Sequence, residues 1–316
     1  MQSKHLKRMM LYVLTVLSSG FGAQMAQAAK LPVDWLNDMH HAIHNLNYAG
    51  PVVYQVGSNV AVMQLEHTAH AEHEVEQLHS LNGQPHEIVR RPGALSTQQT
   101  PHPSIPLAGL TPRQHTLGLN CLFNYQQMAP HYQIRLGAQH RIANRTTQII
   151  DIKPLDTLRF GRRLYLDQET KLPLRSVLLN HVGKPLAQTL FVDFQLTPSK
   201  PNIQAQHIHS TAMQPKSHRY TASTRWRFEQ LPIGFDMMMH NDQRPKHQAH
   251  FIFSDGLSMV SLYLEPWSDE GMAGYSKRGA TWILGTRKYN HRVTLLGEVP
   301  KMTLQKMADA IRPVYQ

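Results

Sequence analysis

Apolar and polar residues alternate along the tract from position 131 to position 196, and short turn sequences divide it into segments. A period of two places successive side chains on opposite faces of a β-strand. The tract predicts a meandering antiparallel sheet with one buried face, which favours binding over chemistry. The buried face is expected to carry Leu158, Phe160, Leu164, Leu166, Leu186, Leu190, Val192, Phe194 and Leu196, and the other face Arg159, Arg163, Tyr165 and Asp167.

An amphipathic segment at 31–47 precedes this tract and is followed by more strand-like runs. Leu36, Met39 and Ile43, with Leu46 after them, recur at helical spacing. We expect a helix there, with Asp34 as its N-cap. Strands are expected at 51–56, 59–67, 73–80 and 86–91, the last two joined by a hairpin turn at Asn82-Gly83.

Two proline-rich stretches interrupt the strand pattern. Prolines between 92 and 112 exclude a central strand or helix interior and predict a long loop, which would act as a lid over the sheet. The polar stretch 198–222 holds three further prolines and predicts an interdomain linker. The chain then divides into a large domain at 29–197 and a small domain at 223–316.

The small domain reads as a mixture of strands and one terminal helix. Strands are expected on both sides of Asp255-Gly256, and a second hairpin is expected to turn near Asn290. The residues at 266–280 read as a loop. Thr303 is expected to cap a final helix, with Leu304, Met307 and Ile311 on one stripe and Pro313 ending it. The predicted class is α+β.

The first 28 residues have the features of a secretory signal peptide. Lys4, Lys7 and Arg8 precede a short apolar core, and Ala26 and Ala28 supply small residues for cleavage after position 28. The alternative is a membrane anchor, but the apolar core is shorter than the roughly 20 residues that a spanning helix needs. We expect an exported protein.

The net charge limits the kinds of partner expected for such a protein, and the cysteine content limits its disulfides. The net charge is +11, and it is spread along the chain. In an exported protein this favours acidic partners such as anionic lipid head groups, phosphorylated glycolipid or an acidic protein, and not nucleic acid. The single cysteine, Cys121, excludes an intrachain disulfide and reads as a small buried residue.

Histidines and arginines gather in two places. His67, His70, His73 and His79 lie among glutamates, but strand alternation separates them and position 77 of the HExxH-like string is Gln. They are interpreted as solvated side chains, with metal binding and sensitivity to mild acid left open. The arginines at 159–163 are interpreted as solvated sheet residues, with capture of a carboxylate or phosphate as the alternative.

No motif of a known catalytic class is present. Seven segments along the chain carry a recognisable pattern, at 46–55, 78–90, 135–154, 159–179, 231–237, 253–266 and 293–311. Taken together, they resemble the MucB/RseB family of periplasmic regulators. The resemblance implies a large N-terminal domain similar to lipoprotein-carrier folds, an unclosed β-barrel with helices, and a smaller α+β domain. It further implies a non-enzymatic protein that binds the periplasmic part of a membrane anti-sigma factor. That binding would shield the anti-sigma factor from regulated proteolysis, and lipid or lipopolysaccharide pieces would release it.

Two sets of residues are candidates for these roles, and neither a metal nor a cofactor is expected. Their selection rests on pattern and position. A homo-oligomer stays open. The candidate lipid-cavity residues are Val53, Val62, Leu65, Leu158, Phe160, Leu164, Leu190, Val192 and Phe194, and the candidate partner contacts are Arg90, Arg91, Trp226, Phe235, Tyr263 and Trp267.

Two rival functions remain at this level. A lipid or lipoprotein carrier would share the half-open barrel, need no anti-sigma partner, and transfer an acyl chain to an acceptor. An exported hydrolase would need a catalytic site that the sequence does not display.

Overall fold

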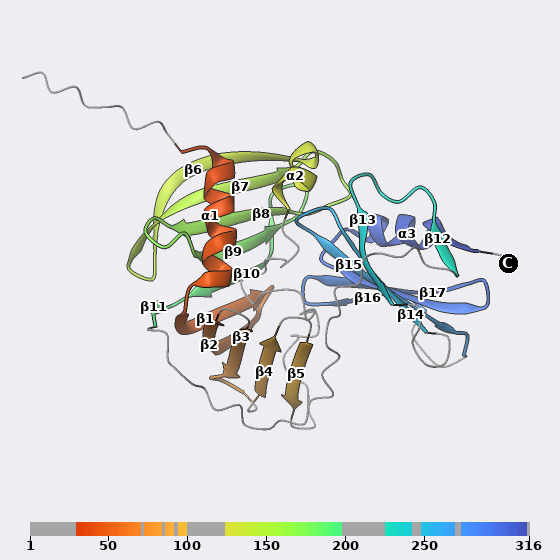
Figure 1. Ribbon diagram of the computed structural model, residues 1–316, viewed down its shortest axis with the longest axis horizontal. Helices are drawn as coiled ribbons and strands as arrows, with labels where there is room; N and C mark the ends of the chain where they lie inside the picture. The colour runs from red at the N-terminus through yellow and green to blue at the C-terminus, as the bar shows by residue number, and fades with distance from the viewer. Residues whose placement is uncertain are drawn as a thin grey trace, which may run out of the picture. The chain divides into compact units, whose positions relative to one another are not determined.

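The computed structural model describes residues 30–70, 73–83, 86–91, 94–99, 124–197, 225–241, 248–268 and 273–314 (Figure 1). Within these ranges the chain forms two main antiparallel sheets, a short two-stranded ribbon and a few helices. The predicted signal peptide, Cys121 and the predicted linker at 198–222 lie outside them. None of the described helices is both long enough and apolar enough to cross a membrane.

The larger sheet is made of two runs of consecutive strands, β1 to β5 and β6 to β10, which join where β1 pairs with β10, and it does not close. Its order is β5-β4-β3-β2-β1-β10-β9-β8-β7-β6, with β11 paired to β1, so the described β5 and β6 are end strands. The α+β class and the unclosed sheet are confirmed. The bounds are β1 Tyr48–Val56, β2 Asn59–His70, β3 His73–Ser80, β4 His86–Arg91, β5 Ala94–Gln99, β6 Tyr132–Ile142, β7 Arg145–Pro154, β8 Gly161–Asp167, β9 Pro173–Leu179, β10 Pro185–Phe191 and β11 Gln195–Leu196.

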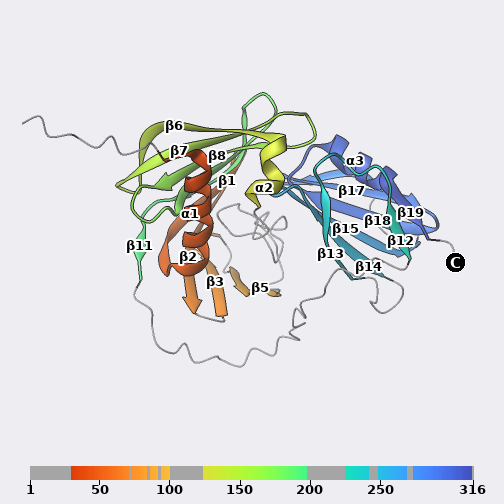
Figure 2. The same cartoon turned by 45° about the horizontal axis from the view of Figure 1, so that its top comes forward.

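Helix α1, Pro32–Asn45, lies across one face of the larger sheet (Figures 1 and 2). Its buried side chains include Trp35, Leu36, Met39 and Ile43, and they pack into one core with the sheet. The predicted apolar stripe is therefore confirmed. The predicted N-cap is wrong, because Asp34 lies in the first turn of a helix that begins at Pro32, a favourable place for proline.

Both faces of the larger sheet are covered at β8, which the simple alternation did not predict. In β8, Tyr165 and Asp167 are buried together with Leu164 and Leu166. The guanidinium of Arg175 lies 5.0 Å from the Tyr165 ring centroid. A long arginine stem covers apolar surface while its head stays polar, so the second face is closed by amphipathic side chains rather than left to water.

The buried face predicted for β10 is wrong. Ala187, Thr189 and Phe191 are the buried residues of this strand. Val192 is 56% exposed and Leu196 is 52% exposed. The error has a register cause: the apolar even positions of β10 looked continuous with 192 and 196, but β10 ends at Phe191, and the buried positions of the strand are the odd ones, of which Phe191 belongs to the core that contains α1.

The smaller sheet has the order β13-β14-β15-β18-β17-β16, and the ribbon pairs β12 with β19. Both predicted hairpins are confirmed. The proposed loop at 266–280 is wrong for its second half, which forms β16. The bounds are β12 Trp226–Phe228, β13 Asp236–Asn241, β14 Ala249–Ser254, β15 Met259–Pro266, β16 Gly274–Arg278, β17 Thr281–Lys288, β18 His291–Gly297 and β19 Ile311–Pro313.

The described helices that follow α1 are short and placed at specific contacts. Helix α2, Tyr125–Met128, and the 3₁₀ turn η2, Ala129–His131, precede β6. Helix α3, Lys301–Ala310, packs its Leu304 and Met307 into the core of the smaller sheet. Thr303 was predicted to cap this helix, but it is buried inside it, and the helix ends at Ala310 before Pro313.

The proline-rich stretch was predicted to be loop throughout. Its described part, Ala94–Gln99, is strand β5, paired with β4. The prediction is wrong there because the prolines lie outside this short run, which leaves its backbone free to pair. The residues at 100–123, with most of the predicted lid, lie outside the described ranges.

Candidate functional site

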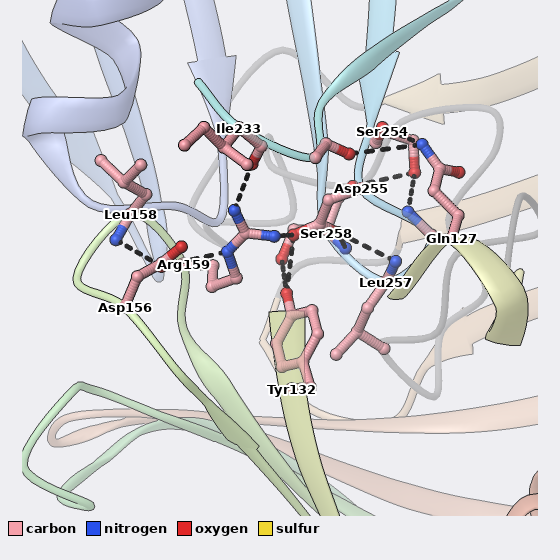
Figure 3. Close-up of polar contacts among 12 residues, drawn as sticks. Gln127, Tyr132, Asp156, Leu158, Arg159, Ile233, Ser254, Asp255, Leu257 and Ser258 are labelled. Atoms are coloured by element: carbon pink, nitrogen blue, oxygen red, sulfur yellow. Dashed lines mark hydrogen bonds and ion pairs between the residues drawn. The ribbon is translucent and has the colours of Figure 1, made fainter. Parts of the chain in front are cut away.

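Arg159 is a fully buried charged residue of the described core, and it joins segments of both halves of the chain. Its side chain has no solvent exposure. Its Nε donates to Asp156 Oδ1 at 3.1 Å, and its Nη1 donates to Asp255 Oδ2 at 3.1 Å. Its Nη2 donates to the carbonyl oxygen of Ile233. Figure 3 shows the three contacts around one guanidinium.

Asp255 is held in place by the turn between β14 and β15. Its Oδ1 accepts the backbone N–H groups of Leu257, at 3.0 Å, and of Ser258, at 2.6 Å. An aspartate that bonds the backbone two residues on stabilises such a turn. The Tyr132 hydroxyl, at the start of β6, donates to Oδ2 at 2.8 Å (Figure 3). Each carboxylate oxygen thus accepts two hydrogen bonds.

The protonation states follow from this environment. Burial raises the pKa of the Asp255 carboxyl, and the donors of Ser258, Leu257 and Arg159 oppose that shift. Burial also raises the pKa of the Tyr132 hydroxyl well above its ordinary range, and the charge of Asp255 adds to the shift. Tyr132 therefore stays protonated and remains a hydrogen-bond donor.

Aromatic rings complete the surroundings of Arg159. Its guanidinium carbon lies 5.6 Å from the Tyr132 ring centroid and 5.3 Å from that of Phe235. Cation–π contacts of this length stabilise a desolvated guanidinium. The arrangement positions these charged and polar groups and satisfies their hydrogen bonds. We call the set Tyr132, Asp156, Arg159 and Asp255 the polar junction.

Helix α2 adds a neighbouring contact to the polar junction. Gln127 Nε2 donates to the Ser254 carbonyl at 2.7 Å, and the Asn124 N–H donates to the Gly256 carbonyl at 2.9 Å. Gly256 has a φ of +90°, and a Cβ there would lie 2.5 Å from the Asn124 oxygen. Only glycine satisfies both the backbone angle and the close approach.

A second group of contacts joins the two sheets near the start of β8. Phe160, Leu178, Ala187 and Ala280 form a buried cluster, and Trp282 of β17 packs against it. Arg162 Nη2 lies 3.4 Å from Glu298 Oε2. The Thr303 hydroxyl of α3 donates to the carbonyl oxygen of Leu158. We call the buried cluster together with Trp282 the Trp282 cluster.

The nine candidate cavity residues do not share one face. Val53 pairs directly with Val62 on one side and with Leu190 on the other, so these three lie together. Leu164 lies in a different cross-strand row of the sheet, in which its successive partners are Ser176, Thr189 and Tyr54. Because Tyr54 and Val53 are adjacent in β1, their two rows of side chains lie on opposite faces of the sheet. A single cavity lined by all nine is therefore excluded.

Their burial also differs. Leu65, Leu164 and Phe194 are core residues with α1, Leu190 packs against that core, and Phe160 belongs to the Trp282 cluster. Leu158 is half-buried and gives its carbonyl to Thr303. Val53 and Val62 are half-buried, and Val192 is exposed.

The six candidate partner contacts also separate. Trp226 and Phe235 are buried at 7% and 2% exposure, in the core of the smaller sheet. Tyr263 and Trp267 are half-buried; the Tyr263 ring stacks on His250 at 4.2 Å, and the Arg287 guanidinium lies 4.7 Å from the Trp267 ring. Arg90 and Arg91 end strand β4, and the cross-strand partner of Arg90 is Glu76.

The interpretation of the histidines as solvated is wrong for His67. It is 1% exposed, its Nδ1 lies 2.8 Å from the Leu46 carbonyl, and its Nε2 lies 3.1 Å from Glu74. The other oxygen of Glu74 lies 3.0 Å from His44 of α1. These contacts tie α1 to β2 and β3. Within the described residues no cluster has the geometry of a metal site.

Arg159 was expected on a solvated face, and the structure reverses that expectation. It precedes β8, which begins at Gly161, so strand alternation does not apply to it. Its carboxylate partner is 96 positions away in the sequence. Two features of the sequence could have pointed to its burial: an aspartate three residues before it, and the Asp255-Gly256 turn. Neither feature specifies that Arg159 pairs with Asp255.

The fold and the polar junction together define an α+β protein of two antiparallel sheets, one open, linked by buried charges. Comparison with known proteins makes this specific. The MucB/RseB N-terminal domain model matches residues 32–215, and the MucB/RseB C-terminal domain model matches residues 220–312. The chain belongs to the MucB/RseB family.

Characterised relatives match over nearly their whole lengths. The sigma factor AlgU regulatory protein MucB of Pseudomonas aeruginosa is 29% identical, over 95% of this chain and 96% of the relative. The sigma-E factor regulatory protein RseB of Escherichia coli K12 is 22% identical, over 88% of this chain and 89% of the relative. The solved MucA/MucB complex of P. aeruginosa contains a chain with a TM-score of 0.67 and 26% identity, covering 90% of this chain and 99% of that one.

Proposed function

We propose that this protein is a periplasmic regulator that binds the periplasmic part of a membrane anti-sigma factor and protects it from regulated proteolysis. The observation that carries the proposal is the match of both family models along the chain. It is supported by a 26% identical relative that was solved in complex with MucA, and by relatives named as regulators of the AlgU and sigma-E factors.

The open sheet, the smaller sheet and their polar contacts suit a protein that recognises a partner rather than transforms one. A surface formed by two sheets keeps one shape only if their contact is fixed. Arg159 fixes it by bonding Asp156 on its own side and Asp255 on the other. A buried charge pair of this kind favours one geometry, because any other leaves a desolvated charge unpaired.

Release by lipid or lipopolysaccharide pieces would then be a matter of differential binding. A ligand changes the affinity for the anti-sigma factor only if it binds one arrangement of the protein more tightly than the other. The polar junction and the Trp282 cluster are the elements that would differ between the arrangements, since both connect the two sheets. Export by a cleaved signal peptide at 1–28 places the protein in the same compartment as its partner.

The contact surface is proposed at Tyr263, Trp267, Arg90 and Arg91. Tyr263 and Trp267 keep exposed aromatic surface on β15 and just after it. Aromatic residues and arginine supply much of the binding energy at protein interfaces. Trp226 and Phe235 contribute indirectly, because they are core residues that hold the smaller sheet in shape.

The test is a pull-down with the periplasmic segment of the anti-sigma factor encoded in the same genome, using the mature chain as bait. Stoichiometric capture, together with slower cleavage of the captured segment by an added protease, is the expected result. Tyr263→Ala with Trp267→Ala should weaken capture, while Tyr289→Ala, an exposed tyrosine on the β17–β18 turn, should not. Failure of the folded mature chain to capture the segment overturns the proposal.

The rival function, an acyl-chain or lipoprotein carrier, predicts a different outcome. It requires stoichiometric acyl binding and transfer to an acceptor, with no dependence on the anti-sigma segment. The single cavity once expected from the nine apolar residues does not exist as one surface, because they occupy both faces of the sheet. The regulator is therefore the function that the geometry supports best.

A further inference from the structure

Both ring nitrogens of the buried His67 face oxygen atoms that accept hydrogen bonds. Its Nδ1 lies 2.8 Å from the Leu46 carbonyl oxygen, and its Nε2 lies 3.1 Å from Glu74 Oε1. A carbonyl and an ionised carboxylate have no proton to donate, and a neutral imidazole donates from only one of its two nitrogens. Neutral His67 therefore leaves one lone pair directed at an oxygen. Both contacts are hydrogen bonds only when the pair of His67 and Glu74 holds one additional proton.

Burial makes that proton matter. The His67 side chain has no solvent exposure, so water does not take the place of a missing donor. The ring stacks on Tyr48 of β1, with 4.6 Å between the ring centroids and 16° between the ring planes. This packing limits how far the imidazole can turn to find another partner. A buried polar atom that loses its hydrogen bond costs more free energy than an exposed one.

Glu74 extends this dependence to helix α1. Its Oε2 lies 3.0 Å from Nδ1 of His44, in the last turn of the helix, and this end of α1 lies close to β1 and β2 (Figures 1 and 2). The ring of His40, one turn earlier, lies edge-on to that of His44 with 4.7 Å between centroids. The Glu74 side chain is 24% exposed, so it can turn to water once His67 no longer donates to it. We call His44, His67 and Glu74 the histidine clasp.

The neighbouring strand presents a second carboxylate to His67. Glu76 is 2% exposed and is the cross-strand partner of His67, on the same face of β3 as Glu74. The next partner in this row is Arg90 of β4. The described side chains that face His67 from β3 are therefore acidic, and an imidazolium is the charge that matches them.

We propose that the histidine clasp is a pH-sensitive contact, which holds the last turn of α1 on β2 and β3 in mild acid and releases it as the medium becomes alkaline. Histidine exchanges its second proton between about pH 5 and pH 8. The clasped state binds one proton more than the released state, so a rise in pH shifts the equilibrium towards release. This device lies outside the proposed function and does not depend on it.

Hydrogen–deuterium exchange of the mature chain at about pH 5.5 and about pH 8 tests the proposal. The amide of Leu46, which donates to the Ala42 carbonyl at 3.0 Å, reports on the last turn of α1. Its protection factor, which corrects for the pH dependence of intrinsic exchange, should fall about tenfold between the two conditions, as expected for the loss of one hydrogen bond to a charged group. The amides of α3 should keep their protection.

Glu74→Gln separates a titrating contact from a merely structural one. The glutamine amide donates to neutral His67 with its nitrogen and accepts from His44 with its oxygen, so these contacts need no additional proton. The last turn of α1 should stay protected in this variant at both pH values. Lower protection at both, as the loss of a structural ion pair would give, contradicts the proposal. Glu66→Gln is the matched control, because it removes the same charge from an exposed position of β2 and should keep the tenfold change.

His67→Gln is the second variant, because it removes the titrating ring itself. Its protection at Leu46 should not depend on pH, whereas His41→Gln, at an exposed position of α1, should behave as the unmodified chain does. Circular dichroism should show the variants folded. The proposal is overturned if protection of Leu46 in the unmodified chain is equal at the two pH values or higher at the alkaline one, or if Glu74→Gln responds to pH as Glu66→Gln does.

Discussion

Two arginine–aspartate pairs begin four residues apart in the chain and behave as opposites. Arg159 and Asp255 both have 0% side-chain exposure, whereas Arg163 and Asp151 have 43% and 34%. Arg159 reaches across 96 sequence positions, and Arg163 only across 12, to the neighbouring strand. The first pair connects two halves of the molecule, and the second lies on one sheet.

Burial separates the ion pairs that determine the architecture from those that do not. An exposed pair gains little, because water solvates both charges almost as well. A buried pair contributes little net stability against an apolar replacement, but removing one partner is costly because the other stays desolvated. An arginine and an aspartate thus form an exposed pair on the surface of one sheet in the first case, and a buried pair that fixes the contact between the sheets in the second.

The largest expected effect comes from Arg159→Met. Asp255 would lose its cation while remaining buried, so we expect a loss of about 3–5 kcal/mol in the free energy of unfolding. Urea unfolding followed by circular dichroism measures it. A loss below about 1 kcal/mol would show that the buried pair is no more important than an exposed one.

Tyr132→Phe should give an intermediate effect. The substitution keeps the ring beside Arg159 but removes the hydroxyl that donates to Asp255. A hydrogen bond to a charged group contributes about 1.5–3 kcal/mol, and we expect a loss in that range by the same unfolding assay. Tyr165→Phe serves as the control, since it also alters a buried tyrosine but one that lies away from the polar junction.

The pH dependence should differ in sign between Asp255 and a second buried aspartate. Desolvation pushes the pKa of Asp167 up, but the donors of Arg145 and Thr170 outweigh it and leave it below the ordinary 3.8. Stability from Asp167 is therefore present above 3.8 and is lost as the pH falls through the lowered value. Burial raises the pKa of Asp255, so its contribution is complete below 3.8 and is lost as the pH rises through the raised value.

Acid titration of two variants tests this contrast. The destabilisation caused by Asp167→Asn should shrink on acidification, and that caused by Asp255→Asn should grow, in urea unfolding carried out from neutral pH to about pH 3. Parallel profiles for the two variants would contradict the opposite pKa directions.

Arg163→Met should have the smallest effect. It removes an exposed pair with the same residue types as the buried one, and we expect a change within about 1 kcal/mol. It is also the matched control for Arg159→Met. If Arg163→Met lowered the free energy of unfolding as much as Arg159→Met, the proposed difference between the exposed and the buried pair would be wrong.

The sequence predicted the parts of the fold that depend on neighbours in the chain. The hairpins at Asn82-Gly83, Asp255-Gly256 and Asn290 are confirmed because turn chemistry and strand alternation are local. The buried face of β10 was wrong, because the strand ends at Phe191 and the apolar positions 192 and 196 lie beyond it. A shift of one residue exchanges the faces of a strand.

The candidate site was harder to predict because its contacts are long-range. Arg159 sits among alternating residues and looks solvated, although it lies just outside β8. Its position is fixed by Asp255 and by the Ile233 carbonyl from the other half of the chain. The pattern of apolar and polar residues within one segment carries no information about a partner so distant in the sequence. Trp226 and Phe235 failed as surface contacts for a related reason: an isolated aromatic has the same pattern in a core as at an interface.

We propose that the two sheets, held together through Arg159, bind the periplasmic segment of an anti-sigma factor. Isothermal titration calorimetry of the mature chain with that segment tests it most directly, with Arg159→Met and Arg163→Met measured alongside. We predict a stoichiometric complex for the unmodified chain and for Arg163→Met, and a weaker one for Arg159→Met. A folded, unmodified chain that produces no binding signal, or an Arg159→Met variant that binds equally well, would contradict the claim.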